Sequence, residues 1–117
     1  MFASVRHYKM GAGSIDSLMH RVEEEFAPAL SQEPGFVCYF ALDTGDHTVQ
    51  TISIFHDTNS AFRSNELAAE YVRENLAEFE LTRTDLTAGE VLVSRLAPDL
   101  LEEMNRWRTE RARRRGW

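Results

Sequence analysis

Residues 36–56 read FVCYFALDTGDHTVQTISIFH. Two runs rich in β-branched and aromatic residues, 36–43 and 48–56, flank the polar segment 44–47, which reads TGDH. Such runs on both sides of a short polar turn are typical of a β-hairpin. We therefore expect two antiparallel strands joined by a tight loop.

The first strand of this hairpin is apolar on both of its alternating sets of side chains. We expect one set to face the helices: Phe36, Cys38, Phe40 and Leu42. The other set then points away from them, beside Phe55: Val37, Tyr39 and Ala41. A sheet face this apolar is rarely left in water. The sequence therefore predicts a homodimer with two-fold symmetry in which the sheets of two copies pack against each other.

Upstream of the hairpin we expect a strand and a helix. Residues 2–9 are rich in β-branched and aromatic side chains and end at the glycine-containing turn 11–13. Ser14 has the position of a helix N-cap, and apolar residues recur at helical spacing over 15–30. Glu-Pro-Gly at 33–35 ends this helix before the hairpin begins.

Downstream of the hairpin, Asp57 is suited to cap a helix that runs to about residue 79. Asn65 is the one polar member of its sheet-facing stripe. The apolar members are Ala61, Ala68, Val72, Leu76 and Phe79. We expect the last strand at 89–97, reached through the Thr-rich segment 81–87, which could itself add a further edge strand.

These elements occur in the order β-α-β-β-α-β. This order is typical of the ferredoxin-like α+β fold, in which both helices cover one face of a four-stranded antiparallel sheet. The 117 residues suffice for one such domain. We divide the chain into a sheet domain, 1–97, and a C-terminal amphipathic helix with an Arg-rich tail, 98–117.

Charge is distributed unevenly along the chain, whose formal net charge is −6. Residues 1–105 contain 7 basic and 18 acidic side chains, whereas 106–117 contain 6 basic and 1 acidic. An acidic body disfavours nucleic-acid binding, because phosphate contacts need a basic surface. We expect the tail arginines to end the terminal helix favourably and then either to fray or to pair with the acidic body; the alternative is contact with RNA or an anionic surface.

Several other site classes are not expected. The single cysteine, Cys38, cannot form an internal disulfide, and we expect a buried thiol. His20 and Glu23 have helical metal-ligand spacing, but without a third ligand we expect a solvated surface and no metal site. No apolar stretch has the length of a membrane span or of a signal-peptide core, so we expect a cytoplasmic protein without membrane contact.

Three turn motifs resemble those of the antibiotic biosynthesis monooxygenase domain, a member of the dimeric α/β-barrel superfamily. They are Gly11-Ala12-Gly13, Glu33-Pro34-Gly35-Phe36-Val37 and Ser60-Ala61-Phe62. The resemblance spans about residues 2–96 and implies a homodimer with a pocket between helices and sheet in each subunit. Members include cofactor-independent oxygenases of polyphenolic substrates, so the resemblance implies an aromatic ligand and no cofactor.

His56 and Asn65 are the candidate catalytic residues. If Ile52 and Ile54 face the helices, alternation places His56 on the same side, toward which Asn65 points from the helix. A neutral histidine can accept a proton from a phenol or hydroquinone, and an asparagine can hold the developing oxyanion. The alternative is that His56 lies at an exposed strand end and that Asn65 bonds a strand carbonyl or water.

The candidate substrate-binding residues are Arg6, His7, Tyr8, Phe40 and Ile54. The inward face of the first strand is left open between two sets. The sets are Phe2, Ser4, Arg6 and Tyr8, or Ala3, Val5 and His7. The small apolar residues of the second set favour an inward His7. The alternative role of Arg6 is a solvated or interface charge.

Two functions follow from these features. The first is a small cofactor-independent monooxygenase-like protein that acts on or binds an aromatic or quinol-type metabolite in a pocket between helices and sheet. The alternative is a non-catalytic homodimer that binds a small ligand or serves as an interaction module.

Overall fold

The computed structural model describes residues 1–115, with the side chains of Ala112 and Arg115 left out. Trp117, the end of the predicted Arg-rich tail, lies outside the described residues. The strands are β1 (Phe2–Met10), β2 (Phe36–Gly45), β3 (Thr48–Phe55) and β4 (Leu81–Glu90). They form one antiparallel sheet in the order β2-β3-β1-β4.

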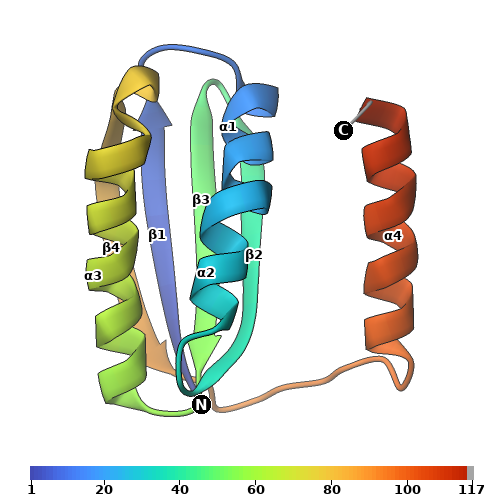
Figure 1. Cartoon of the computed structure of the whole chain (residues 1–117). Helices are drawn as coiled ribbons and strands as arrows, with labels where there is room; N and C mark the ends of the chain where they lie inside the picture. The colour runs from blue at the N-terminus through green and yellow to red at the C-terminus, as the bar shows by residue number, and fades with distance from the viewer. Residues whose placement is uncertain (116–117) are drawn as a thin grey trace.

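The helical elements are α1 (Ile15–Arg21), the π-helical turn η1 (Val22–Phe26), α2 (Ala27–Ser31), α3 (Thr58–Asn75), the 3-10 turn η2 (Ala77–Phe79) and α4 (Leu100–Arg115). In Figure 1, α1, α2 and α3 lie on one face of the sheet and α4 stands apart beyond β2. This arrangement confirms the predicted ferredoxin-like α+β fold with an extra C-terminal helix.

The first helical stretch begins as predicted and then changes its geometry. The Ser14 side chain caps α1 by accepting a hydrogen bond from the backbone of Ser17. The wider turn η1 lies directly before α2, which has Pro28 in its first turn. Proline lacks the backbone N–H that would donate to an earlier helical carbonyl, so a local departure from α geometry at this point has a chemical cause.

The hairpin is tighter than its sequence predicts. β2 extends to Gly45 and β3 begins at Thr48, which leaves two central turn residues. Asp46 and His47 both have positive φ, at 52° and 60°, which is the geometry of a type I′ turn. The twist of this turn matches that of the two strands it joins.

Which side chains of β2 face the helices differs from the prediction. The register of β2 against β3 shifts between Phe36 and Cys38, where a bulge adds one residue. A one-residue shift exchanges the two faces of a strand. Tyr39 consequently pairs with inward-facing Ser53, whereas Phe40 pairs with Ile52 on the other face. The predicted inward orientation of Phe40 is therefore wrong.

The inward orientation assumed for Ile52 and Ile54 on β3 is also wrong, and the structure decides the choice between two sets that the sequence left open for β1. The buried residues of β3 are Val49, Thr51, Ser53 and Phe55, so Ile52 and Ile54 point away from the helices. The buried residues of β1 are Ser4, Arg6, Tyr8 and Met10, so His7 points away from them as well. Thr51 and Ser53 can be buried under the helices because their hydroxyl groups accept hydrogen bonds from Arg6.

The last strand is 81–90, which contains the segment expected only as an additional edge strand, and the prediction of a strand at 89–97 is wrong. β4 pairs with β1 from Leu81 opposite Met10 to Glu90 opposite Phe2. Beyond Glu90 the partner strand ends, and Val91 makes one hydrogen bond to Met1. A strand needs a neighbouring strand along its whole length. The residues after Val91 have a high strand propensity but no neighbouring strand to pair with.

Helix α3 presents the predicted stripe to the sheet. Its cap is confirmed, because Asp57 Oδ1 accepts a hydrogen bond from Ser60 N at 2.7 Å. The helix ends at Asn75, somewhat earlier than expected, and η2 completes the stripe with buried Phe79. Gly13, with φ +78°, passes so close to this ring that a Cβ would lie 2.7 Å from it. The glycine turn therefore fixes both the chain direction and this contact.

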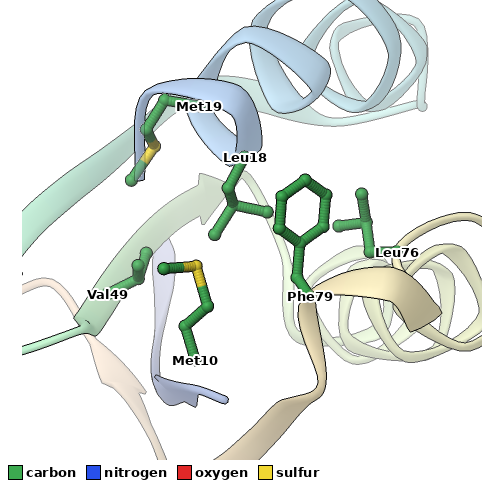
Figure 2. Packing of buried hydrophobic residues seen from close by; sticks show 6 residues of the cluster. All are labelled: Met10, Leu18, Met19, Val49, Leu76 and Phe79. Carbon is green, nitrogen blue, oxygen red and sulfur yellow. The ribbon is translucent and has the colours of Figure 1, made fainter. Parts of the chain in front are cut away.

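Two apolar clusters fill the space between helices and sheet. Figure 2 shows the first: Met10, Leu18, Met19, Val49, Leu76 and Phe79. The second is Phe26, Leu30, Phe55, Ala61 and Ala68. The polar side chains of Ser4, Arg6 and Ser53 are also buried on this side of the sheet. The helix-covered face is thus apolar in these two clusters. It is polar at Ser4 and Arg6 of β1 and at Ser53 of β3.

The opposite face of the sheet has no helix over it. We call the apolar residues on it the outer face: Ala3, Val5, Cys38, Phe40, Leu42, Ile52 and Ile54. Phe40 is 43% exposed and Leu42 is 37% exposed. The surface left uncovered is therefore apolar, as predicted, although different residues of β2 form it.

The segment after β4 buries little of its apolar surface. Leu92 is 84% exposed and Leu101 is 76% exposed. An ion pair between Arg108 Nε and Glu23 Oε1, at 3.8 Å, joins α4 to η1. No helix within residues 1–115 is both long and apolar enough to cross a bilayer.

Candidate functional site

A pocket lies between the helices and the inner side of the sheet. The space inside it that a water-sized sphere can occupy is about 40 Å³, so the pocket is narrow in this structure. Most lining side chains are apolar and come from α1, η1 and α3 on one side and from the strands on the other. The lining residues with polar groups are Arg6, Tyr8, Tyr39, Thr51 and Tyr71.

Arg6 is the only charged residue among the described residues that line the pocket. Its side chain is held from three directions. Nε donates to Thr51 Oγ1 at 3.1 Å and an Nη2 hydrogen to Ser53 Oγ at 3.1 Å. Nη1 donates to Asn65 Oδ1 at 2.5 Å, which connects β1 to α3. The guanidinium group is therefore fixed by β3 and α3 together.

The charge of Arg6 has no opposite charge beside it within the described residues. Arg6 is 1% exposed, and its three hydrogen-bond partners are neutral oxygens. Burial lowers the pKa of its guanidinium, and the charge of Arg83 acts in the same direction. Removing a charge from water is costly unless another charge compensates it. The site therefore has a strong local preference for negative charge.

Tyr8 and Tyr39 lie close enough to Arg6 to interact with its charge. Burial raises the pKa of both hydroxyl groups, and the positive charge of Arg6 opposes this effect. Neither hydroxyl makes a hydrogen bond within the part of the chain that the structure describes. Both tyrosines therefore stay protonated near neutral pH and have an O–H group available as a donor.

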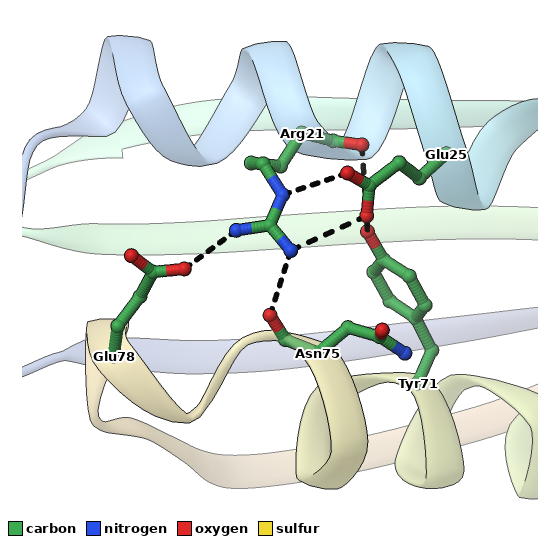
Figure 3. Close-up of polar contacts among 5 residues, drawn as sticks. All are labelled: Arg21, Glu25, Tyr71, Asn75 and Glu78. Carbon is green, nitrogen blue, oxygen red and sulfur yellow. Dashed lines mark hydrogen bonds and ion pairs between the residues drawn. The ribbon is translucent and has the colours of Figure 1, made fainter.

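A network of hydrogen bonds joins α1 and η1 to α3 and η2, as Figure 3 shows. Arg21 Nε donates to Glu25 Oε2 at 2.8 Å and Nη2 donates to the Asn75 carbonyl at 2.9 Å. Nη1 of the same arginine pairs with Glu78. Tyr71, a pocket residue, donates to Glu25 Oε1 at 2.6 Å. These bonds fix the spacing of the helices that cover the pocket.

The structure separates the two predicted catalytic residues. Asn65 faces the sheet as predicted, where its amide accepts from Arg6 and donates to Ser4 Oγ at 3.3 Å. His56 follows inward-facing Phe55 at the exposed end of β3 and does not line the pocket. The predicted convergence of His56 with Asn65 is wrong, because it depended on an inward Ile54.

Some of the predicted substrate-binding residues line the pocket and others do not. Arg6 and Tyr8 line the pocket. His7, Phe40 and Ile54 lie on the other face of the sheet, so the structure does not place them in this pocket. The bulge in β2 accounts for the outward Phe40, whereas β1 and β3 pair without a bulge, so His7 and Ile54 follow from which face of these two strands the helices cover.

Sequence reasoning did not find Tyr39, Thr51 and Tyr71 as pocket residues. Tyr39 was assigned to the opposite face, since the bulge after Phe36 was not foreseen. Tyr71 follows Ala68 by three positions, so helical periodicity could have placed it beside the predicted stripe. The alternation of β3 would have placed Thr51 correctly only with the opposite choice of inward set.

The pocket can bind and polarise a ligand, but its lining supplies no ordinary base. None of the described lining residues is a histidine, carboxylate, lysine or cysteine. No group of three or more potential metal ligands of the His, Cys, Asp or Glu type is present among the described residues. The available chemistry is therefore one positive charge, several hydroxyl donors and an apolar wall.

Neither a family profile nor a curated relative matches the sequence. Solved structures do match. SnoaB, a cofactor-independent oxygenase from Streptomyces nogalater, is 15% identical over 80% of this chain and 94% of its own, with a TM-score of 0.59. A dimeric ferredoxin-like protein from an uncultured marine organism is 11% identical over 82% and 98%, with a TM-score of 0.64.

A candidate antibiotic biosynthesis monooxygenase from Deinococcus radiodurans is 15% identical over 83% of this chain and 98% of its own, with a TM-score of 0.62. At such identities the likeness establishes the fold. The chain therefore has the ferredoxin-like fold found in these proteins, as its turn motifs predict.

Proposed function

We propose that this chain binds an aromatic or quinol-type metabolite in the pocket between helices and sheet and acts on it as a cofactor-independent monooxygenase. The observation that carries the proposal is the pocket itself, where an apolar wall meets the buried Arg6 guanidinium and the Tyr8 and Tyr39 hydroxyls. A flat ring system with oxygen substituents has matching chemistry. The shared fold with the oxygenase SnoaB supports the same reaction class.

The proposed reaction converts a CH₂ group of an activated ring to a carbonyl, with dioxygen giving one oxygen atom to the product and one to water. Both electron pairs come from the substrate. Negative charge then develops on an oxygen conjugated with the reacting carbon. Arg6 stabilises this charge, and Asn65 acts as a positioning residue because it holds the guanidinium group.

We further propose that the protein is a homodimer whose subunits meet through the outer face. This face is apolar and uncovered, and exposed apolar patches mark association surfaces. A second copy of the same face covers it with two-fold symmetry. The similar marine protein is itself dimeric, which supports the proposal.

The alternative function is a non-catalytic homodimer that binds a small ligand. One observation favours it specifically: the described pocket lining contains no ordinary base, so a substrate that needs its proton removed by the protein finds no acceptor there. Under this alternative a bound quinol leaves the protein unchanged in air.

The decisive experiment is to incubate the purified protein with a panel of quinols and anthrones in air. Oxygen uptake and the mass of the product are measured. We expect a compound that gains one oxygen atom and loses two hydrogens, at a rate at least ten-fold lower for Arg6→Met. The matched control is His56→Ala, which changes an exposed residue outside the pocket and should keep the rate of the unmodified protein.

Each other outcome contradicts part of the proposal. A ligand that binds and is recovered unchanged supports the non-catalytic alternative. Loss of activity in His56→Ala with an intact fold would restore the sequence-based role of that residue. No binding across the panel would contradict the assignment of the pocket to aromatic metabolites.

A further inference from the structure

We propose that α4 is an interaction surface for a second copy of this chain. The α4 helix of the second copy lies antiparallel to it in the groove between α4 and α1, so that each copy's α4 lies between α4 and α1 of the other. This contact involves neither the ligand pocket nor the outer face. In Figure 1, α1 is on the helix-covered side of the sheet and α4 stands beyond β2, whereas the outer face is on the opposite side.

The groove separates the C-terminal half of α4 from the start of α1. The space in it that a water-sized sphere can occupy is about 600 Å³, against about 40 Å³ in the ligand pocket. Its lining residues are Asp16 from α1 and Trp107, Arg111 and Arg114 from α4. Trp107 is 52% exposed, and the Arg111 guanidinium lies over its ring at 5.8 Å from the centroid. An aromatic ring and cations therefore face a wide, open space.

Little holds α4 to its own sheet domain. The ion pair of Arg108 Nε with Glu23 Oε1 is long, at 3.8 Å, and the two side chains are 63% and 48% exposed. Ion pairs with this exposure contribute little to stability. Leu101 is 76% exposed on the same helix. α4 therefore presents apolar and charged surface that its own domain does not use.

The side of α4 toward the groove has the spacing of a helix–helix contact. Four residues recur at intervals of four, three and four positions: Leu100, Met104, Trp107 and Arg111. This alternation is the one with which two helices pack side by side. The set is symmetric about its midpoint, so an antiparallel copy places Met104 opposite Trp107 of the second copy. Leu100 then lies opposite the methylene groups of Arg111, which are apolar.

Charge complementarity sets the antiparallel direction. The first turn of α4 and the residue before it are acidic, and the second half of the helix is rich in arginine. Pairing about the same midpoint brings Glu103 opposite Arg108 of the second copy and Asp99 close to its Arg114. Parallel pairing would instead bring like charges together. The antiparallel direction also aligns the two helix dipoles favourably.

The same charges disfavour a polyanion such as RNA as the occupant. Asp16 lines the groove and Glu23 lies beside α4, so phosphate groups would meet carboxylates there. A helix with one acidic and one basic half finds an opposite charge for each half. The second copy of α4 is such a helix.

The contact is reciprocal, so it closes on itself with two-fold symmetry. Two helices of 16 residues bury less than the about 1,200 Å² at the low end of stable interfaces. We therefore expect a weak contact, with a dissociation constant of about 100 μM. It joins sheet-to-sheet dimers to one another at high concentration and is absent at about 1 μM, where the contact through the outer face can be measured by itself.

The test is sedimentation equilibrium of the unmodified protein in low salt, from about 1 to about 500 μM, on both sides of the expected dissociation constant. We expect the average mass of the sheet-to-sheet dimer to rise toward twice its value across this range. Because salt screens exposed charges, about 0.5 M NaCl should weaken the association at least five-fold.

Charge reversal then assigns the contact to α4. One variant has Arg108→Glu and Arg114→Glu, and the other has Asp99→Lys and Glu103→Lys. Each alone should raise the dissociation constant at least about ten-fold, because like charges then face each other. An equimolar mixture of the two variants should associate as tightly as the unmodified protein, since each basic half again meets an acidic one.

Two controls accompany these variants. Glu66→Lys with Glu70→Lys makes the same change of charge on the exposed side of α3 and should leave the association unchanged. Glu23→Gln removes the ion pair of Arg108 with its own domain and should not weaken the contact either.

The outcomes are distinct. An average mass that does not rise above that of the dimer overturns the proposal. Association that both charge-reversed variants retain places the contact outside α4. A mixture that fails to recover overturns the pairing of acidic with basic halves. Binding of a short single-stranded RNA without self-association would assign α4 to a polyanion instead.

Discussion

At several positions of β1 and β3 the two faces of the sheet have opposite characters. On β3 the side chains toward the helices include Thr51 and Ser53, and those on the outer face are Ile52 and Ile54. On β1 the buried side is polar at Ser4 and Arg6, whereas the outer side has small apolar residues. A sheet with one covered face usually has the reverse pattern.

This difference points to the helix-covered side of the sheet as the one whose residues are not explained by stability alone. A buried arginine with serine and threonine partners gives less stability than an apolar core of the same volume. Its presence under the helices agrees with the proposed binding of a ligand on that side. The apolar outer face, in turn, agrees with the proposed homodimer, in which a second copy covers it. The following predictions test this contrast, from the largest expected effect to the smallest.

The helix-covered face should carry most of the stability. Phe55 is fully buried and in edge contact with Phe36. Phe55→Ala should therefore lower the free energy of unfolding by about 3–5 kcal/mol. Phe40→Ala on the outer face should cost less than about 1 kcal/mol when measured by urea unfolding at a protein concentration too low for association. Equal losses would show that the two faces do not differ in this way.

The outer face should carry the association. Ile52→Lys places a charge in the centre of this face and should raise the dimer dissociation constant at least about 100-fold, or about 2.7 kcal/mol, in sedimentation experiments. Ala69→Lys adds the same side chain to the exposed side of α3 and serves as the control. A dimer that survives Ile52→Lys would place the interface elsewhere.

The helix layer depends on the cap of α3. Asp57→Ala removes the side chain that accepts from Ser60 N and should lower the unfolding free energy by about 1 kcal/mol. Asp57→Asn keeps an acceptor at the same place and should recover most of this loss. The measurement is thermal or urea unfolding, and a larger loss in Asn than in Ala would contradict the capping role.

The C-terminal segment should contribute little to the sheet domain. Leu101 on α4 remains 76% exposed, so deleting 98–117 should change the unfolding free energy of the remainder by less than about 1 kcal/mol. Circular dichroism and urea unfolding of the shortened chain test this division of the chain. A chain that no longer folds after this deletion would show that α4 belongs to the domain.

The smallest expected effect concerns the network of Figure 3. The hydrogen bond from Arg21, followed by that from Tyr71, lowers the pKa of Glu25. A carboxylate with a lowered folded-state pKa stabilises the fold above its unfolded pKa of about 4.3, and this stability is lost as the pH falls through the folded value. The melting temperature of the unmodified protein should therefore fall more steeply below that pH than that of Glu25→Gln. Parallel curves would contradict this coupling.

Much of the fold could be predicted from local sequence. The caps at Ser14 and Asp57, the helical stripe of α3 and the turn between β2 and β3 lie where their residue types predict. Each of these features depends on side chains a few residues apart, so the sequence contains their cause directly. The order of elements and the ferredoxin-like arrangement follow from them.

The site could be predicted only in part. Arg6, Tyr8 and Asn65 were found as polar residues on elements that face each other, and the structure brings Arg6 and Asn65 into contact. His56 was placed with them by an alternation argument that started from the wrong inward set. Alternation fixes the face of every residue in a strand once one residue has been assigned. An error in that first assignment therefore places every residue of the strand on the wrong face.

The sequence by itself determined the elements, their caps, their order and the presence of an apolar sheet face, since these depend on near neighbours and on composition. Only the tertiary structure decided which face of each strand is covered and where the last strand lies. Bulges and pairing between distant strands set the register, and β4 can extend only as far as β1 is there to pair with it. The same pairing turned Arg6 inward and so placed the charge of the pocket.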